Sequence, residues 1–162
     1  MTAIDELLAR RTGEQREPVP ADDPVPSLHL AVLTCMDARI DVFDVLRLNR
    51  GEVHVLRNAG GVATEDVLRS LAISQRKLAT REVIVMQHTS CGMATVTEDG
   101  FKNELESATG LRPTWAVEAF RDVEASVRQS VERIRRSPFV PHTDSVRGFV
   151  YDVATGGVTE VG

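Results

Sequence analysis

The segment Leu30–Arg39, with the sequence LAVLTCMDAR, decides the fold and the chemistry that we predict for this chain. Its first residues are apolar at nearly every position, which is typical of a strand that is covered on both faces of a sheet. The run stops at Cys35 and is followed by charged residues. A second apolar run, Val83–Met86, stops in the same way before His88 and Cys91. We therefore expect two buried strands whose carboxyl ends meet and hold one metal ion.

Length, composition and charge restrict the class of protein. A chain of 162 residues fits one domain with a hydrophobic core, and a hydrophobic content of 42% is ordinary for a globular protein. The net charge of -5 argues against a nucleic-acid binder. No apolar run approaches the ~20 residues of a membrane span, and the first residues lack the apolar core of a secretory signal. Two distant cysteines favour metal binding or catalysis over a disulfide, and we expect a cytoplasmic protein.

The chain divides into two parts of unequal size. Residues 1–27 predict a short helix followed by an arm that contains four prolines. The helix places Ile4, Leu7 and Leu8 on one face, because side chains three and four residues apart are neighbours on a helix. A helix this short is unstable alone in water, so we expect it to dock on a partner subunit. Residues 28–162 predict a single α/β domain that contains the expected metal site.

Strands and helices alternate within this domain. Strands are expected over Leu28–Thr34, Val53–Leu56, Glu82–Gln87 and Val146–Val153, with a short fifth strand over Val158–Val161. Helices are expected over Asp41–Leu48, Thr64–Leu78, Glu98–Ala108 and Glu118–Arg136. This alternation predicts a mostly parallel sheet with flanking helices, in the order two-one-three-four with an antiparallel fifth strand at the edge. Ligands of such sheets bind at the carboxyl ends of the strands, here strands one and three.

The residues at these two strand ends suit zinc. Zinc prefers thiolate and imidazole ligands, and His88 and Cys91 are three residues apart across a turn. Cys35 adds a third ligand from the neighbouring strand. Three protein ligands leave the fourth tetrahedral position open to water, which is the arrangement of catalytic zinc. A buried cysteine taken alone is usually only a small hydrophobic residue, so the prediction rests on the combination of motifs.

An acid and a base follow the first ligand. Asp37 can accept a hydrogen bond from zinc-bound hydroxide, or it can become a fourth zinc ligand in a closed state. Arg39 can hold the Asp37 carboxylate in a fork-like pair, which would orient the hydroxide and keep the fourth position open. These two residues are the predicted catalytic residues of the site.

A turn rich in glycine follows the second strand. Paired glycines at Gly60 and Gly61 allow backbone conformations that other residues avoid. We expect this turn to shape the wall of the cleft, and the alternative is a plain turn that only connects two elements. The predicted substrate-binding residues are Asn58, Ala59, Gly60 and Gly92.

Three motifs together resemble the β-class carbonic anhydrases, and in particular the short bacterial and archaeal branch of that family. They are Cys35-Met36-Asp37-Ala38-Arg39, Arg57-Asn58-Ala59-Gly60-Gly61 and His88-Thr89-Ser90-Cys91-Gly92-Met93. The resemblance implies reversible hydration of carbon dioxide to bicarbonate and a proton by zinc-bound hydroxide, and one zinc ion per chain held by Cys35, His88 and Cys91. It also implies a homodimer or a higher homo-oligomer, with no nucleic-acid or membrane partner.

Two alternatives to this function stay open. Relatives of the family hydrolyse carbonyl sulfide or carbon disulfide at the same kind of zinc site, and all these substrates are linear triatomic molecules. A non-catalytic zinc-binding module on the same fold is the alternative from a different class. The presence of both Asp37 and Arg39 speaks against such a module, because a structural zinc site needs neither.

Overall fold

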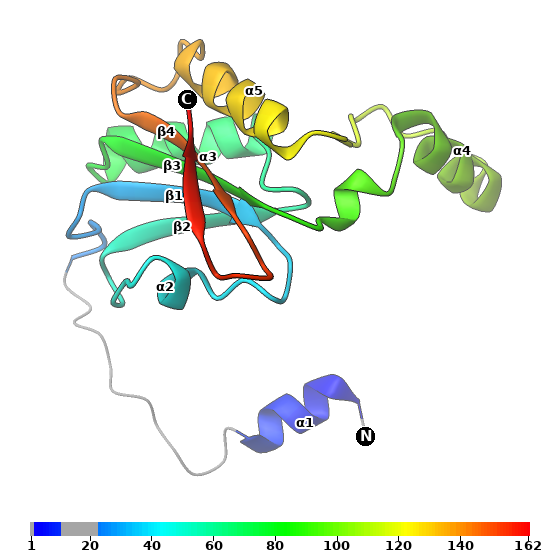
Figure 1. Ribbon diagram of the computed structural model, residues 1–162, viewed down its shortest axis with the longest axis horizontal. Helices are drawn as coiled ribbons and strands as arrows, with labels where there is room; N and C mark the ends of the chain where they lie inside the picture. The colour runs from blue at the N-terminus through cyan, green and yellow to red at the C-terminus, as the bar shows by residue number, and fades with distance from the viewer. Residues whose placement is uncertain (1, 11–22) are drawn as a thin grey trace.

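The computed structural model describes residues 2–10 and 23–162, and Figure 1 shows the arrangement of its elements. The helices are α1 (Ala3–Arg10), α2 (Val42–Val45), α3 (Glu65–Lys77), the 3-10 helix η1 (Gly92–Ala94), α4 (Glu98–Thr109) and α5 (Val123–Arg135). The strands are β1 (Leu30–Cys35), β2 (Val53–Asn58), β3 (Glu82–His88), β4 (Val146–Tyr151) and β5 (Val158–Val161).

The five strands form one sheet in the order β2-β1-β3-β4-β5. The first four are parallel, and β5 pairs antiparallel with β4 at the edge. The predicted order and the antiparallel edge strand are therefore confirmed. Parallel neighbours place their carboxyl ends at the same edge of the sheet, so the ends of β1 and β3 lie side by side.

Each face of the sheet has its own hydrophobic core. Helices α3 and α5 cover one face, where the apolar side chains of β1 and β3 pack against Leu71 of α3 and Val127 and Ile134 of α5. The other face carries α2 and the loops that follow the strands. Its core contains Cys35 and Cys91 among Val32, Ile40, Val42 and Met86. Burial on both faces explains why the central strands are apolar at nearly every position.

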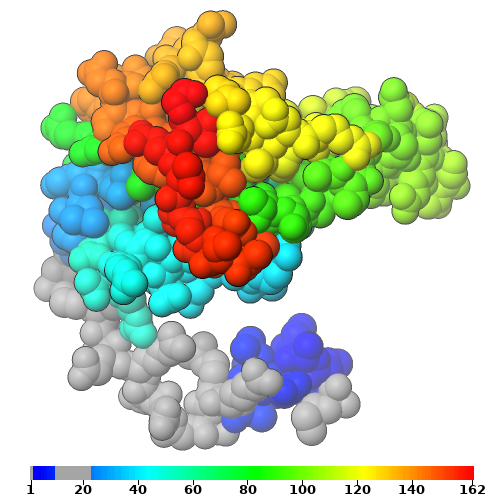
Figure 2. All heavy atoms as spheres, viewed as in Figure 1, coloured from blue at the N-terminus to red at the C-terminus, as the bar shows by residue number. Residues whose placement is uncertain are grey.

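Two helices differ from their predicted limits. Helix α5 begins at Val123 instead of residue 118, because Asp122 caps it by accepting a hydrogen bond from the Ala125 N–H at 3.1 Å. Glu118 has a φ of +58°, which is incompatible with a right-handed helix. Helix α2 is limited to four residues, again capped by an aspartate, Asp41. Helix α4 follows its prediction closely, ends at Gly110 in the left-handed conformation, and projects from the body of the molecule (Figure 2).

The N-terminal helix is present and exposes its apolar face. In α1 the side chains of Ile4, Leu7 and Leu8 are each more than half exposed. The arm predicted before residue 28 falls mostly on residues 11–22, which lie outside the described part of the chain. Across the part that the structure describes, every helix is too short or too polar to serve as a transmembrane segment.

Candidate metal centre

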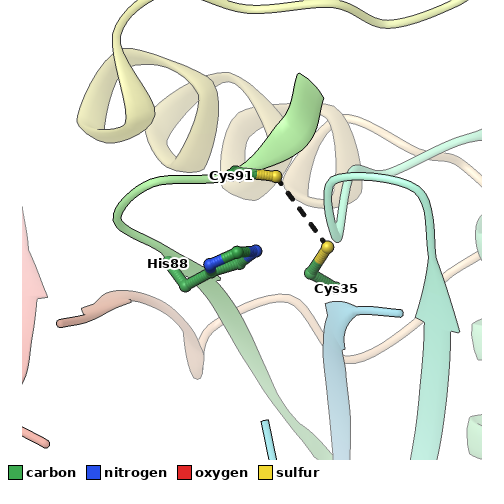
Figure 3. A group of neighbouring side chains, drawn as sticks. All are labelled: Cys35, His88 and Cys91. Atoms are coloured by element: carbon green, nitrogen blue, oxygen red, sulfur yellow. Dashed lines mark hydrogen bonds between the residues drawn. The ribbon is translucent and has the colours of Figure 1, made fainter. Parts of the chain in front are cut away.

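The three predicted ligands lie together at one edge of the sheet. Cys35 is the last residue of β1, His88 is the last residue of β3, and Cys91 directly precedes η1. Their ligand atoms all lie within 4.8 Å of one another, and the two sulfur atoms are 3.9 Å apart. Figure 3 shows both thiols and the imidazole ring directed toward a common space. Within residues 2–10 and 23–162 no other group of this kind is found.

The local backbone explains how His88 and Cys91 reach the same space. Ser90, between them, has a φ of +54°, and this left-handed residue turns the chain back toward the sheet. Thr89 continues the ladder for one residue beyond β3, because its N–H donates to the Tyr151 carbonyl at 3.0 Å. The turn is therefore anchored to β4 just before it reverses, which directs Cys91 toward Cys35.

The histidine is oriented as a ligand of metal. Its Nδ1 lies 2.8 Å from the Thr89 carbonyl oxygen, which can only accept, so Nδ1 carries the proton. The other ring nitrogen, Nε2, faces the two thiols and is buried without a hydrogen-bond partner among the described residues. A buried ring nitrogen without a partner is unfavourable unless something binds it. Two sulfur ligands and one imidazole nitrogen fit zinc, with the fixed tautomer that metal-bound histidines show.

The two thiols differ in acidity. Burial raises the pKa of Cys35, but the neighbouring His88 ring and the backbone N–H groups of Asp37 and Gly60 outweigh it and lower the pKa to about 7. Burial raises the pKa of Cys91 to about 11, and the neighbouring Cys35 sulfur adds to this effect. A cation placed between the sulfurs would favour both thiolates and remove their mutual repulsion.

The predicted acid–base pair is formed beside the ligands. Arg39 donates to both carboxylate oxygens of Asp37, from Nε at 2.9 Å and from Nη2 at 2.7 Å. These bonds hold the pKa of the Asp37 carboxyl well below its usual range. The same Nη2 donates to the Ser90 carbonyl at 2.9 Å, so Arg39 also connects the two motifs. The Oδ2 atom of Asp37 lies 3.6 Å from His88 Nε2, at the rim of the ligand cluster.

The glycine turn packs directly against the first ligand. A side chain at Gly61, whose φ is +65°, would place its Cβ 2.8 Å from the Cys35 nitrogen. At Gly60 a Cβ would lie 3.1 Å from Phe120 Cε1, whereas at Gly92 it would meet open space. The Asn58 Oδ1 atom accepts from the Val62 N–H at 3.0 Å, and its Nδ2 atom donates to the Val62 carbonyl at 2.8 Å. These two bonds join the beginning and the end of the turn. Ala59 lies in the same turn.

Arg57 stands in the second motif, but the sequence alone assigns it no role. Arg57 donates to the backbone carbonyls of Cys35 at 2.8 Å, Asp37 at 2.7 Å and Ile40 at 3.1 Å. It thereby fixes the loop that carries Cys35, Asp37 and Arg39. The sequence marks Arg57 only as the first residue of the motif Arg57–Gly61, and nothing in that motif indicates these three hydrogen bonds.

Comparison with known proteins places this geometry in a family. Residues 30–158 match the family model for carbonic anhydrase. Beta-carbonic anhydrase 1 of Mycobacterium tuberculosis is 51% identical over 164 residues, covering 99% of this chain and 99% of that protein. The crystal structure of carbonic anhydrase from Streptococcus mutans covers 100% of this chain and 99% of its own, with a TM-score of 0.88 and 36% identity.

A second group of relatives carries a different name. Carbon disulfide hydrolase of Acidithiobacillus thiooxidans is 32% identical over 148 residues, covering 78% of this chain and 74% of that protein. Its identity is lower and its coverage shorter than those of the mycobacterial relative. The family model matches most of the chain, the mycobacterial enzyme is 51% identical over nearly its full length, and the Streptococcus mutans structure covers all of it. The chain therefore belongs to the β-carbonic anhydrase family.

Proposed function

We propose that this chain is a zinc-dependent carbonic anhydrase that reversibly hydrates carbon dioxide to bicarbonate and a proton. The observation that carries the proposal is the buried cluster of Cys35, His88 and Cys91, in which His88 Nε2 has no hydrogen-bond partner in the part of the chain that the structure describes. These three residues would hold one zinc ion per chain. When bound, zinc lowers the pKa of a coordinated water so that a nucleophile is available near neutral pH.

The residues beside the cluster have separate roles in this proposal. The Asp37 carboxylate accepts a hydrogen bond from the attacking water and orients it, which its place 3.6 Å from His88 Nε2 permits. Arg39 holds that carboxylate with two hydrogen bonds and keeps it ionised. If the pair breaks, the carboxylate is free to move onto the ligand cluster and close the site.

The wall of the substrate cleft is assigned to the turn after β2 and to the start of η1. Gly92 presents backbone without a side chain, and a Cβ there would meet open space, whereas Gly60 is buried beneath the side chains of Phe120 and Met93 and would support the wall from within. A linear apolar molecule needs little more than such a surface beside the nucleophile. Ala59 adds a single methyl group, and Asn58 shapes the turn through its two bonds to Val62.

Hydrolysis of carbon disulfide or carbonyl sulfide is the second candidate function. It is favoured by the relatives named carbon disulfide hydrolase, whose 32% identity extends over 78% of this chain. The cluster and the Asp37–Arg39 pair would serve either substrate, since each reaction begins with attack of an activated water on a central carbon atom. The greater identity to Beta-carbonic anhydrase 1 favours carbon dioxide.

Assembly into a homodimer or higher homo-oligomer belongs to the same proposal. An isolated eight-residue helix is unstable in water, and α1 exposes Ile4, Leu7 and Leu8 in this chain. Packing this face against a second copy of the chain would cover it. A reducing compartment such as the cytoplasm suits a site with two thiolate ligands, which oxidation would destroy.

The experiment that tests the function is a stopped-flow comparison of substrates. Zinc-loaded protein is mixed with carbon dioxide, carbonyl sulfide or carbon disulfide, and Asp37→Asn serves as the matched variant. We expect fast hydration of carbon dioxide, slow or absent turnover of the sulfur compounds, and loss of activity without loss of zinc in Asp37→Asn. Preferential turnover of a sulfur compound would select the second function, and no turnover of any substrate would indicate a non-catalytic zinc module.

A further inference from the structure

Gln87, immediately before His88 in β3, is buried in an unusual way. Its side chain is fully buried, and its Oε1 atom has no hydrogen-bond partner within residues 2–10 and 23–162. The Nε2 atom of the carboxamide donates to the Gly61 carbonyl at 3.2 Å. Burying an amide with half of its polar atoms unpaired opposes folding, so an apolar residue of similar volume would serve the core at least as well. The glutamine therefore calls for an explanation other than stability.

Gln75 is a second buried glutamine of the same protein, and both ends of its carboxamide form hydrogen bonds. Its Nε2 donates to the His142 carbonyl and its Oε1 accepts from the His142 N–H, both at 2.8 Å. These bonds join α3 to the loop before β4. Gln75 is therefore a matched control for Gln87, with the same chemistry and a purely structural setting.

The hydrogen bond from Gln87 reaches the turn that supports the first metal ligand. The turn is closed by the Asn58 carboxamide, which bonds both backbone groups of Val62. On one side, Gly61 packs against the Cys35 backbone so closely that a Cβ would lie 2.8 Å from its nitrogen. On the same side, the Met36 N–H donates to the Asn58 carbonyl at 2.8 Å. Any shift of this small closed turn would therefore move the backbone on both sides of the Cys35 side chain.

We propose that Gln87 is a positioning residue of the metal centre, which holds the Gly61 carbonyl so that the turn keeps the Cys35 backbone, and with it the Cys35 sulfur, in place. Residues outside the ligand set that orient the ligands strengthen the binding of the metal. Gln87 thus links β3, which carries His88, to the turn that orients the cysteine on β1. This inference rests on zinc binding at Cys35, His88 and Cys91.

The test compares Gln87→Met and Gln75→Met with the wild-type protein. Methionine keeps the length and approximate volume of glutamine but cannot donate to a carbonyl. Each zinc-loaded protein is mixed with a coloured chelator to measure the rate of zinc release, and each cobalt-substituted protein gives the thiolate-to-cobalt charge-transfer absorption. Thermal unfolding of the same samples reports stability.

The two variants should separate metal binding from stability. Gln87→Met should release zinc about tenfold faster or more and shift the charge-transfer band, with a melting temperature within about 2 °C of the wild type. Gln75→Met should melt about 3–6 °C lower while its zinc release and cobalt spectrum stay unchanged, because two hydrogen bonds far from the site are lost. Gln87→Leu is a second variant without a donor and should behave like Gln87→Met.

Three results would overturn the inference. They are unchanged zinc release and an unchanged spectrum in Gln87→Met, an equal acceleration of zinc release in both methionine variants, and failure of both Gln87 variants to fold. The last result would show that Gln87 serves the fold itself. A wild-type protein that binds no zinc would instead refute the proposed function, so the two failures are distinguishable.

Discussion

Replacing Gly61 with alanine is the sharpest steric perturbation that the metal centre offers. The new Cβ would lie 2.8 Å from both the Cys35 nitrogen and the Thr34 carbonyl carbon, which are backbone atoms that cannot turn aside. The φ of +65° adds a second penalty, because L-residues with a side chain disfavour the left-handed region. Gly51 provides the control: its φ is +83°, but a Cβ there would meet nothing within 4 Å.

The two glycines allow the magnitudes to be separated. Gly51→Ala should lose about 1–2 kcal/mol of the free energy of unfolding, which is the conformational penalty alone. Gly61→Ala should lose about 2–5 kcal/mol, because overpacking adds about 1–3 kcal/mol to the same penalty. For a domain of this size each kcal/mol lowers the melting temperature by about 2–4 °C. Gly61→Ala should also release zinc faster than the wild type, since relief of the clash must displace the backbone of Cys35.

The assay is thermal unfolding of both variants with and without zinc, together with zinc release to a chelator. Equal losses of stability in Gly61→Ala and Gly51→Ala would refute the reasoning, because the close packing of the turn on Cys35 would then have no energetic effect. Normal zinc release from a strongly destabilised Gly61→Ala would refute its second part.

Three further predictions concern the catalytic pair, the ligands and the assembly. Arg39→Ala should free Asp37 to close the site, and stopped flow should then show carbon dioxide hydration at neutral pH that is about tenfold slower or more. If this variant is as active as the wild type across the pH range, Asp37 has a packing role only. Affinity for zinc, measured by competition with a chelator, should rise with pH. The pKa of the Cys91 thiol is raised to about 11, and its proton must leave when the metal binds. An affinity that does not depend on pH would contradict this. Deletion of Met1–Asp23 should weaken self-association in sedimentation experiments, and unchanged self-association of the deletion variant would show that α1 is not part of an interface.

The sequence predicts the sheet and the ligand cluster because both have local signals. The apolar runs that become β1 and β3 are unbroken, and each stops at a residue that can bind a metal. Once the chain alternates strands and helices, the parallel order follows from general rules of topology, and Cys35 must then lie near His88. The capping residue Thr64 likewise marks the start of α3 in sequence and in structure.

Other parts of the site depend on contacts between distant residues and have no local signal. Nothing near Arg57 in the sequence indicates that it donates to three carbonyls of another loop. The same holds for Gln87, whose partner Gly61 is 26 residues away. Helix α5 was predicted to begin at residue 118 because its apolar spacing starts early, but Glu118 instead forms an ion pair with Arg133 at 2.7 Å in a left-handed conformation.

One zinc ion, held by Cys35, His88 and Cys91, is proposed to make this chain a carbonic anhydrase. Titration of the metal-free protein with zinc tests this proposal most directly, with carbon dioxide hydration followed by stopped flow and bound metal measured in the same samples. Activity should be absent without zinc, rise in proportion to bound zinc, and reach its maximum at one zinc ion per chain. Full occupancy without hydration of carbon dioxide, or hydration that is already maximal before zinc is added, would contradict the proposal.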